Sequence, residues 1–180
     1  DGFYYNIIND TIVPFEVEIT YTWGAGSSFN TKNYTELTTL HVPSAVEYQG
    51  TVYNVTRIGE HAFCGAQKLQ QVTMGENIKT IDRFAVINCP QLTEVQIGES
   101  VDSILLDAFS FGKLQQLTIP KNVKYIAPLI VRNNPITSIK VDPENTNYTS
   151  INGVLFNKKE NVLHTFPAAY ATEYTIPESV

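Results

Sequence analysis

The residues whose types and spacing could support catalysis are His61 and Cys64, which lie three positions apart. An imidazole close to a thiol can act as the base of a nucleophilic pair. No motif places a carboxylate to orient this histidine, and the sequence contains no G-x-S-x-G nucleophile elbow. We therefore expect no catalytic residues and a protein that is not an enzyme.

The same residue types give no sign of a metal or cofactor. Cys64 and Cys89, with three histidines elsewhere, have no spacing typical of zinc ligands. The one glycine-dense loop, residues 24–28, lacks the third glycine and the lysine of a phosphate-binding loop. We expect neither a metal nor a cofactor. The two cysteines could form a disulfide or remain two thiols, and the sequence leaves both possibilities open.

Composition and charge exclude two classes of partner. The 180 residues include 12 Lys and Arg against 18 Asp and Glu, which gives a formal charge of −6. Scattered basic residues on an acidic chain cannot neutralise a run of phosphates, so we expect no nucleic-acid partner. No apolar run approaches the ~20 residues that span a bilayer, so we expect no membrane insertion. A hydrophobic content of 43% predicts a globular core.

The elements that position these residues repeat along the chain. One ladder recurs at a nearly constant interval, at Ile58, Ile81, Ile104 and Ile126. A second ladder of the form apolar-x-x-apolar-x-apolar begins at Leu69, Leu92, Leu114 and Ile136. Repeats therefore lie near 55–77, 78–100, 101–122 and 123–145, and a variant unit with a hairpin follows at 146–180. Half-units are visible around residues 37–46 and 174–180.

A single unit of this kind cannot fold alone. Its five large apolar side chains contribute on the order of 10 kcal/mol on burial. Ordering its residues costs roughly 35 kcal/mol at about 1.5 kcal/mol per residue. Stacking the units lets each strand hydrogen-bond its neighbours and merges the small cores, which is the physical basis of a solenoid.

Several segments resemble one known family. These are Ile-Gly-Glu-His-Ala-Phe at 58–63, the strand pattern at 69–74, and the Ile-Pro-Lys-Asn-Val junction at 119–123. They are similar to the BspA-like leucine-rich-repeat family of bacterial cell-surface proteins. The resemblance implies a leucine-rich-repeat solenoid of the α/β horseshoe type, mostly β with short helical turns. It also implies a secreted or cell-surface location. Residues 128–131 depart from the family pattern at the turn of the fourth repeat.

The first 36 residues do not repeat. Apolar and polar residues alternate over 15–21, which predicts a strand with one buried face, and Asn9-Asp10 supplies a turn from the preceding apolar run. We expect an N-terminal β-rich cap with a β-hairpin at 1–36 and the solenoid at 37–180. The many aromatic residues near this end form either the core of the cap or a platform for carbohydrate.

The strand pattern places polar side chains on one outward face, in two columns along the stack. The columns are Gln71, Glu94, Gln116 and Ser138, and Thr73, Gln96, Thr118 and Lys140. The candidate binding residues are Gln71, Thr73, Glu94, Gln96, Gln116 and Thr118. The loop side, with Gln67, Lys68, Arg83 and Lys113, is the competing surface. The columns could also serve only to hydrate the sheet.

The function that follows is a non-enzymatic binding module of a secreted or surface-anchored bacterial protein. A rigid, nearly neutral polar face suits adhesion or protein recognition, with a host or bacterial surface protein or a glycan as partner. Two alternatives are a structural spacer between surface domains and the recognition part of an enzyme. The sequence leaves open the ligand, the anchoring mode and the oligomeric state.

Overall fold

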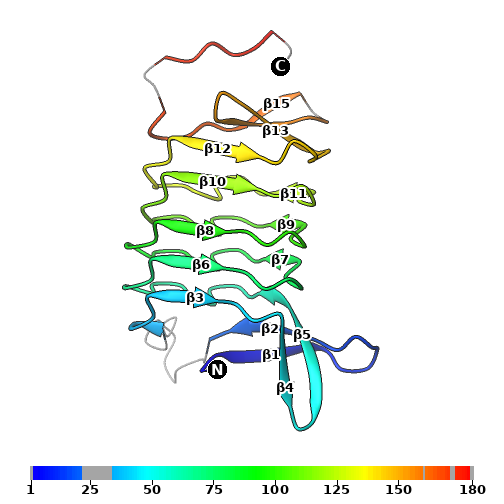
Figure 1. Cartoon of the computed structure of the whole chain (residues 1–180). Helices are drawn as coiled ribbons and strands as arrows, with labels where there is room; N and C mark the ends of the chain where they lie inside the picture. The colour runs from blue at the N-terminus through cyan, green and yellow to red at the C-terminus, as the bar shows by residue number, and fades with distance from the viewer. Residues whose placement is uncertain (1, 22–33, 160, 171–172, 179–180) are drawn as a thin grey trace.

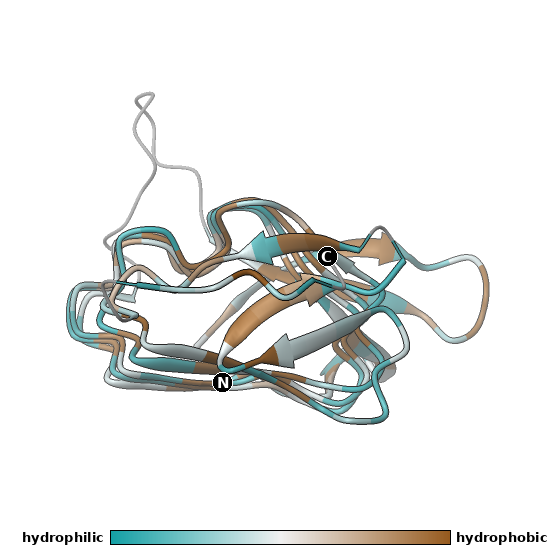
Figure 2. Cartoon of the chain, turned by 90° about the horizontal axis from the view of Figure 1, so that it is seen from above, coloured by the Kyte–Doolittle hydropathy of each residue, from teal (hydrophilic) through white to brown (hydrophobic). Residues whose placement is uncertain are grey.

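The computed structural model describes residues 2–21, 34–159, 161–170 and 173–178. These residues form a stack of similar units, each made of two short strands joined by turns (Figure 1). Seen along the stack, the units superimpose into one flattened outline (Figure 2). No α-helix occurs within the described ranges. The stack therefore has two faces built from strands and a side built from turns.

One face is a sheet of seven strands, which we call the outer sheet. Its order is β1-β2-β5-β7-β9-β11, with β4 paired to β5. The bounds are β1 Tyr4–Asn9, β2 Glu16–Thr20, β4 Ala45–Tyr48, β5 Thr51–Ile58, β7 Thr80–Ile81, β9 Ser103–Ile104 and β11 Tyr125–Ile126. Strands β5, β7, β9 and β11 pair in parallel, with Ile58, Ile81, Ile104 and Ile126 in register. The isoleucine ladder of the sequence is thus the spine of this sheet.

The second face, which we call the strand face, carries the other ladder. It consists of β3 Thr39–His41, β6 Gln71–Thr73, β8 Glu94–Gln96, β10 Gln116–Ile119 and β12 Ser138–Val141. These strands form two separate parallel sheets, β3-β6-β8 and β10-β12. The strand face is therefore interrupted between β8 and β10, while the outer sheet is continuous beside it.

Apolar side chains from both faces meet between them. The central residues of β3, β6, β8, β10 and β12 are buried, namely Leu40, Val72, Val95, Leu117 and Ile139. The four spine isoleucines of the outer sheet are 0 to 3% exposed. Each such side chain contributes about 2 kcal/mol when removed from water. Because these residues belong to one contiguous cluster, every repeat is stabilised by its neighbours.

The turns that join the two faces share a backbone feature. The equivalent residues His61, Phe84, Asp107 and Leu129 all have φ between 52° and 63°. A second set of equivalents, Gly65, Asn88, Phe111 and Asn133, has φ between 55° and 74°. Residues with positive φ cannot continue an α-helix. The connections expected to be short helical turns are therefore tight turns, each bonded to the next repeat, as in Phe63 N to Ala85 O at 2.8 Å.

The two ends of the stack contain antiparallel strands. β1 and β2 form the expected hairpin, and β2 joins the outer sheet through parallel pairing with β5. At the other end, β13 Tyr148–Ile151, β14 Val154–Asn157 and β15 Val162–Thr165 form a three-stranded antiparallel sheet. The division at residue 36 stays a prediction.

Candidate binding surface

The six predicted binding residues lie on the strand face and flank its buried central positions. Gln71, Glu94, Gln96, Gln116 and Thr118 are exposed, and Thr73 is partly exposed. Their columns continue onto β3, because Thr39 pairs with Gln71 and His41 pairs with Thr73. His41 was not among the predicted residues. The half-unit at 37–46, which aligns with later repeats, is the signal that could have identified it.

Hydrogen bonds hold several of these side chains in place. The carboxylate of Glu94 accepts one bond from Gln71 Nε2 at 3.2 Å and another from Gln96 Nε2 at 2.8 Å. His41 Nδ1 and Thr73 Oγ1 are 2.6 Å apart. Side chains that are already ordered lose less entropy when a partner docks. The polar surface of β3, β6 and β8 is thus organised before binding.

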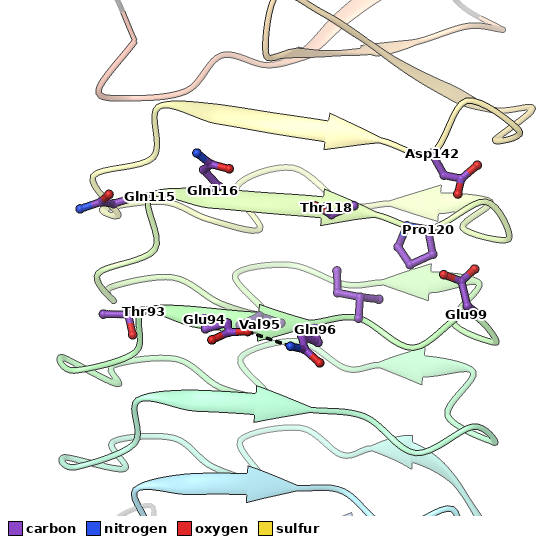
Figure 3. A pocket seen from close by; sticks show the side chains of 11 residues that line it. Thr93, Glu94, Val95, Gln96, Glu99, Gln115, Gln116, Thr118, Pro120 and Asp142 are labelled. Atoms are coloured by element: carbon purple, nitrogen blue, oxygen red, sulfur yellow. Dashed lines mark hydrogen bonds between the residues drawn. The ribbon is translucent and has the colours of Figure 1, made fainter.

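A groove of about 490 Å³ lies on the strand face between β8 and β10 (Figure 3). Its lining residues are Thr93, Glu94, Val95, Gln96, Ile97, Glu99, Gln115, Gln116, Thr118, Pro120 and Asp142. Four of the six predicted residues take part, and the two on β6, Gln71 and Thr73, lie outside it. We call this feature the interstrand groove.

The interstrand groove coincides with a change in repeat length. The segment from the spine isoleucine to the central residue of the strand face is one position longer in the first two repeats than in the next two. Examples are Ile81 to Val95 for the longer segment and Ile104 to Leu117 for the shorter one. Strands β8 and β10 are the neighbours at which the two lengths meet. Because a shorter turn cannot place its strand in the same position, pairing stops there while β7 and β9 remain paired.

Two acidic residues of the groove were missed in the sequence. Glu99 and Asp142 lie where the strands end, opposite the end marked by Thr93 and Gln115 (Figure 3). Both follow a strand rather than belonging to its alternating pattern, so the column argument could not include them. The shortening of the repeat by a single position was the only signal in the sequence for a groove at this place.

The residues that suggested nucleophilic catalysis are in environments that disfavour it. Burial raises the pKa of the Cys64 thiol, and burial also lowers the pKa of His61. A thiolate paired with an imidazolium needs the opposite shifts. Cys64 and Cys89 are both free thiols, and burial raises the pKa of Cys89 to about 12. The glycine-dense loop at 24–28 lies outside the described residues.

Two further properties concern metal binding and membrane crossing. No group of three or more His, Cys, Asp or Glu residues is arranged to hold a metal ion in the described part of the chain. The described residues also include no helix with the length and apolar character needed to cross a bilayer.

On the competing loop side, the basic residues already have polar partners. Lys68 pairs with Glu36, and Arg83 Nη2 lies 2.8 Å from Glu60 Oε2. Lys113 Nζ donates to Gln91 Oε1 at 2.9 Å. A partner that used these cations would have to replace these interactions.

Comparison with known proteins shows which proteins have a similar architecture. A sequence model of the BspA type leucine rich repeat region matches residues 33–162 with six copies. No curated protein matches the chain. Among solved structures, the pneumococcal vaccine antigen PcpA is 16% identical with a TM-score of 0.53, over 99% of this chain and 58% of that one.

Two leucine-rich repeat proteins of other bacteria are also similar. The one from Eubacterium ventriosum is 21% identical with a TM-score of 0.61, over 91% of this chain and 50% of that one. The one from Bacteroides capillosus is 21% identical with a TM-score of 0.58, over 79% of this chain and 99% of that one. The chain thus spans little more than half of PcpA and half of the Eubacterium protein. At these identities the likeness shows the fold, and it confirms the predicted leucine-rich-repeat architecture. Because the family sequence pattern covers residues 33–162, the chain belongs to the BspA type leucine-rich repeat family.

Proposed function

We propose that the chain is a non-enzymatic binding module of a secreted or surface-anchored bacterial protein, and that it holds a partner protein against the strand face. The observation that carries this proposal is the pair of polar columns on a stack with one continuous core. Leucine-rich repeats generally serve protein recognition, and a stiff repeated surface docks with little loss of entropy.

Adhesion at a cell surface is the role this module would serve. One similar structure is described as a pneumococcal vaccine antigen, which supports a surface location for proteins of this fold. The pKa directions at Cys64 and His61 support the non-enzymatic part of the proposal, because neither group is activated for catalysis.

The test is a binding screen of the purified chain over immobilised extracellular-matrix proteins, serum proteins and host glycans. A strand-face variant carries Gln71→Ala, Gln96→Arg and Thr118→Arg. We expect saturable binding to at least one protein, and at least tenfold weaker binding by the variant, because two arginines would project from the docking face.

A matched control carries the same kinds of change on the loop side, at exposed positions: Gln67→Ala, Gln91→Arg and Leu106→Arg. It should bind as the wild type does, and circular dichroism should show all three proteins folded. An equal loss of binding in both variants would show that the binding site does not lie on the strand face. Binding to no immobilised molecule would contradict the proposal and favour a structural spacer.

A further inference from the structure

The interstrand groove has a distinct chemical polarity along its length. The side-chain amides of Gln96, Gln115 and Gln116 and the carboxylate of Glu94 line its middle and one end, and the carboxylates of Glu99 and Asp142 lie at the other (Figure 3). The lining residues include no basic and no aromatic side chain. One end therefore combines amide groups with the single carboxylate of Glu94, which Gln71 and Gln96 hydrogen-bond, and the other end carries two carboxylates.

The carboxylates of the acidic end form no ion pair within the described residues, and Lys121, which follows the lining residue Pro120, pairs with Glu144 at 3.4 Å. Among the described residues, no ion pair involves Glu94, Glu99 or Asp142. Lys140 lies on β12 opposite Thr118, and it too forms no ion pair within the described ranges. Asp142 Oδ1 accepts a bond from Glu144 N at 2.8 Å, which fixes its direction. Two carboxylates at one end of a groove attract a cation and repel an anion.

The shape of the groove favours an extended guest. Its lining follows β8 and the residues after it from Thr93 to Glu99, a distance of roughly 20 Å if the backbone is extended. Amide side chains carry both a donor and an acceptor, so they can bond the N–H and C=O groups of a peptide backbone. A sugar carries no cation for the acidic end, and the groove offers it no aromatic ring for stacking.

We propose that the interstrand groove binds an extended segment of a partner protein that places an arginine or lysine side chain between Glu99 and Asp142. This proposal rests on the proposed function, because it names the kind of partner that the strand face recognises. Arginine is the better fit, since its planar group can bond two carboxylates at once.

The test uses fluorescein-labelled hexapeptide pools with Ser, Thr, Val, Gln and Tyr mixed at five positions. The sixth position, placed first or last, is fixed as Arg, Lys, Gln or Glu. Fluorescence polarisation should show saturable binding of an Arg or Lys pool, at least tenfold tighter than the matching Gln pool. This preference should weaken as NaCl rises from 50 to 300 mM, because salt screens exposed charges.

The decisive variant is Glu99→Gln with Asp142→Asn, which removes two charges at little cost in packing. We expect it to bind the Arg pool at least tenfold more weakly than the wild type. The matched control is Glu76→Gln with Glu47→Gln; Glu76 occupies the position of Glu99 one repeat earlier, where β6 and β8 remain paired. The control should bind the Arg pool as the wild type does.

Three results would overturn the proposal: equal affinity for the Arg and Gln pools, equal loss in the decisive variant and the control, or no binding by any pool. The proposed function would fail in a different way: either the strand-face variant binds immobilised proteins as the wild type does, or the wild type binds none of them. A folded-state check by thermal unfolding accompanies every variant. In a ¹⁵N spectrum, the side-chain amides of Gln96 and Gln116 should shift on addition of the Arg pool.

Discussion

The edge of β11 is closed by two side chains where another strand of the outer sheet would otherwise pair. Tyr148 Oη accepts a hydrogen bond from Ile126 N at 2.9 Å, and His164 Nε2 lies 2.9 Å from Ile126 O. A carbonyl oxygen only accepts, so the imidazole must carry its proton on Nε2. Both backbone groups of a residue that is 3% exposed are thereby satisfied.

Removing the tyrosine hydroxyl tests this closure. Tyr148→Phe leaves the buried Ile126 N–H without its acceptor, so the free energy of unfolding should fall by about 1 to 3 kcal/mol. Urea denaturation followed by fluorescence measures the change. Tyr125→Phe, on the exposed neighbour in the same strand, should change stability by less than about 0.5 kcal/mol. Equal effects of the two substitutions would contradict the assigned role of Tyr148.

Leucine at position 129 occupies a backbone conformation that suits glycine. Leu129 has φ of 63° and is 50% exposed, so its side chain adds little burial to offset the strain. A non-glycine residue in this region costs roughly 1 to 2 kcal/mol. Leu129→Gly should therefore raise the free energy of unfolding by about 1 kcal/mol, after the entropy cost of glycine.

The control for this prediction is a leucine in a neighbouring turn. Leu106 is 37% exposed, and its φ is not among the positive values. Leu106→Gly should lower the free energy of unfolding by about 1 kcal/mol, because this substitution adds the entropy cost of glycine and relieves no strain. Thermal unfolding that moves both variants in the same direction would show that the φ value of Leu129 carries no strain.

At the scale of an element, the hairpin of β1 and β2 makes the cap sensitive to alkaline pH. Burial raises the pKa of Tyr5 and of Tyr34 to about 12, and the proximity of the two rings adds to the effect for Tyr5. Tyr34 Oη donates to Thr20 O at 2.8 Å at the end of β2. The folded chain thus keeps two protons between pH 10 and 12 that the unfolded chain releases.

The stability should therefore be complete below pH 10 and fall as the pH rises towards 12, because the folded state binds more protons there. Chemical denaturation at a series of pH values measures this slope. The variant Tyr5→Phe with Tyr34→Phe should show a flatter curve in that window and run parallel to the wild type below pH 9. An unchanged slope in the variant would locate the alkaline sensitivity elsewhere.

The strands were predictable from the sequence because their burial repeats. Val72, Val95 and Leu117 recur at fixed positions, and each is buried between polar neighbours as the pattern requires. The turns were predictable only in part. Gly65, Asn88 and Asn133 are residue types that adopt a positive φ readily, but Phe84 and Leu129 are not. Phe84 N bonds to Leu106 O of the next repeat at 3.0 Å, a contact that depends on the stack.

At the scale of the whole molecule, the order of the repeats could be derived from spacing alone. The family model matches six repeat copies over residues 33–162, and the boundaries of the repeats stay a prediction. The outward direction of Gln71, Glu94 and Gln116 also follows from the pattern. The interstrand groove did not follow, because it results from a mismatch between two neighbouring repeats. Whether the predicted residues bind a partner stays a prediction.

The change in repeat length also has a mechanical consequence. At the boundary between β8 and β10, the outer sheet and the turns still join the two halves, through Leu105 N to Ile81 O at 2.9 Å and Val86 N to Ala108 O at 2.9 Å. The strand face contributes no paired strands there. Tension along the stack would concentrate at this notch, and a crack would open from the strand face with the outer sheet as its hinge. Separation of the two halves would therefore begin at the same place that we propose for the ligand.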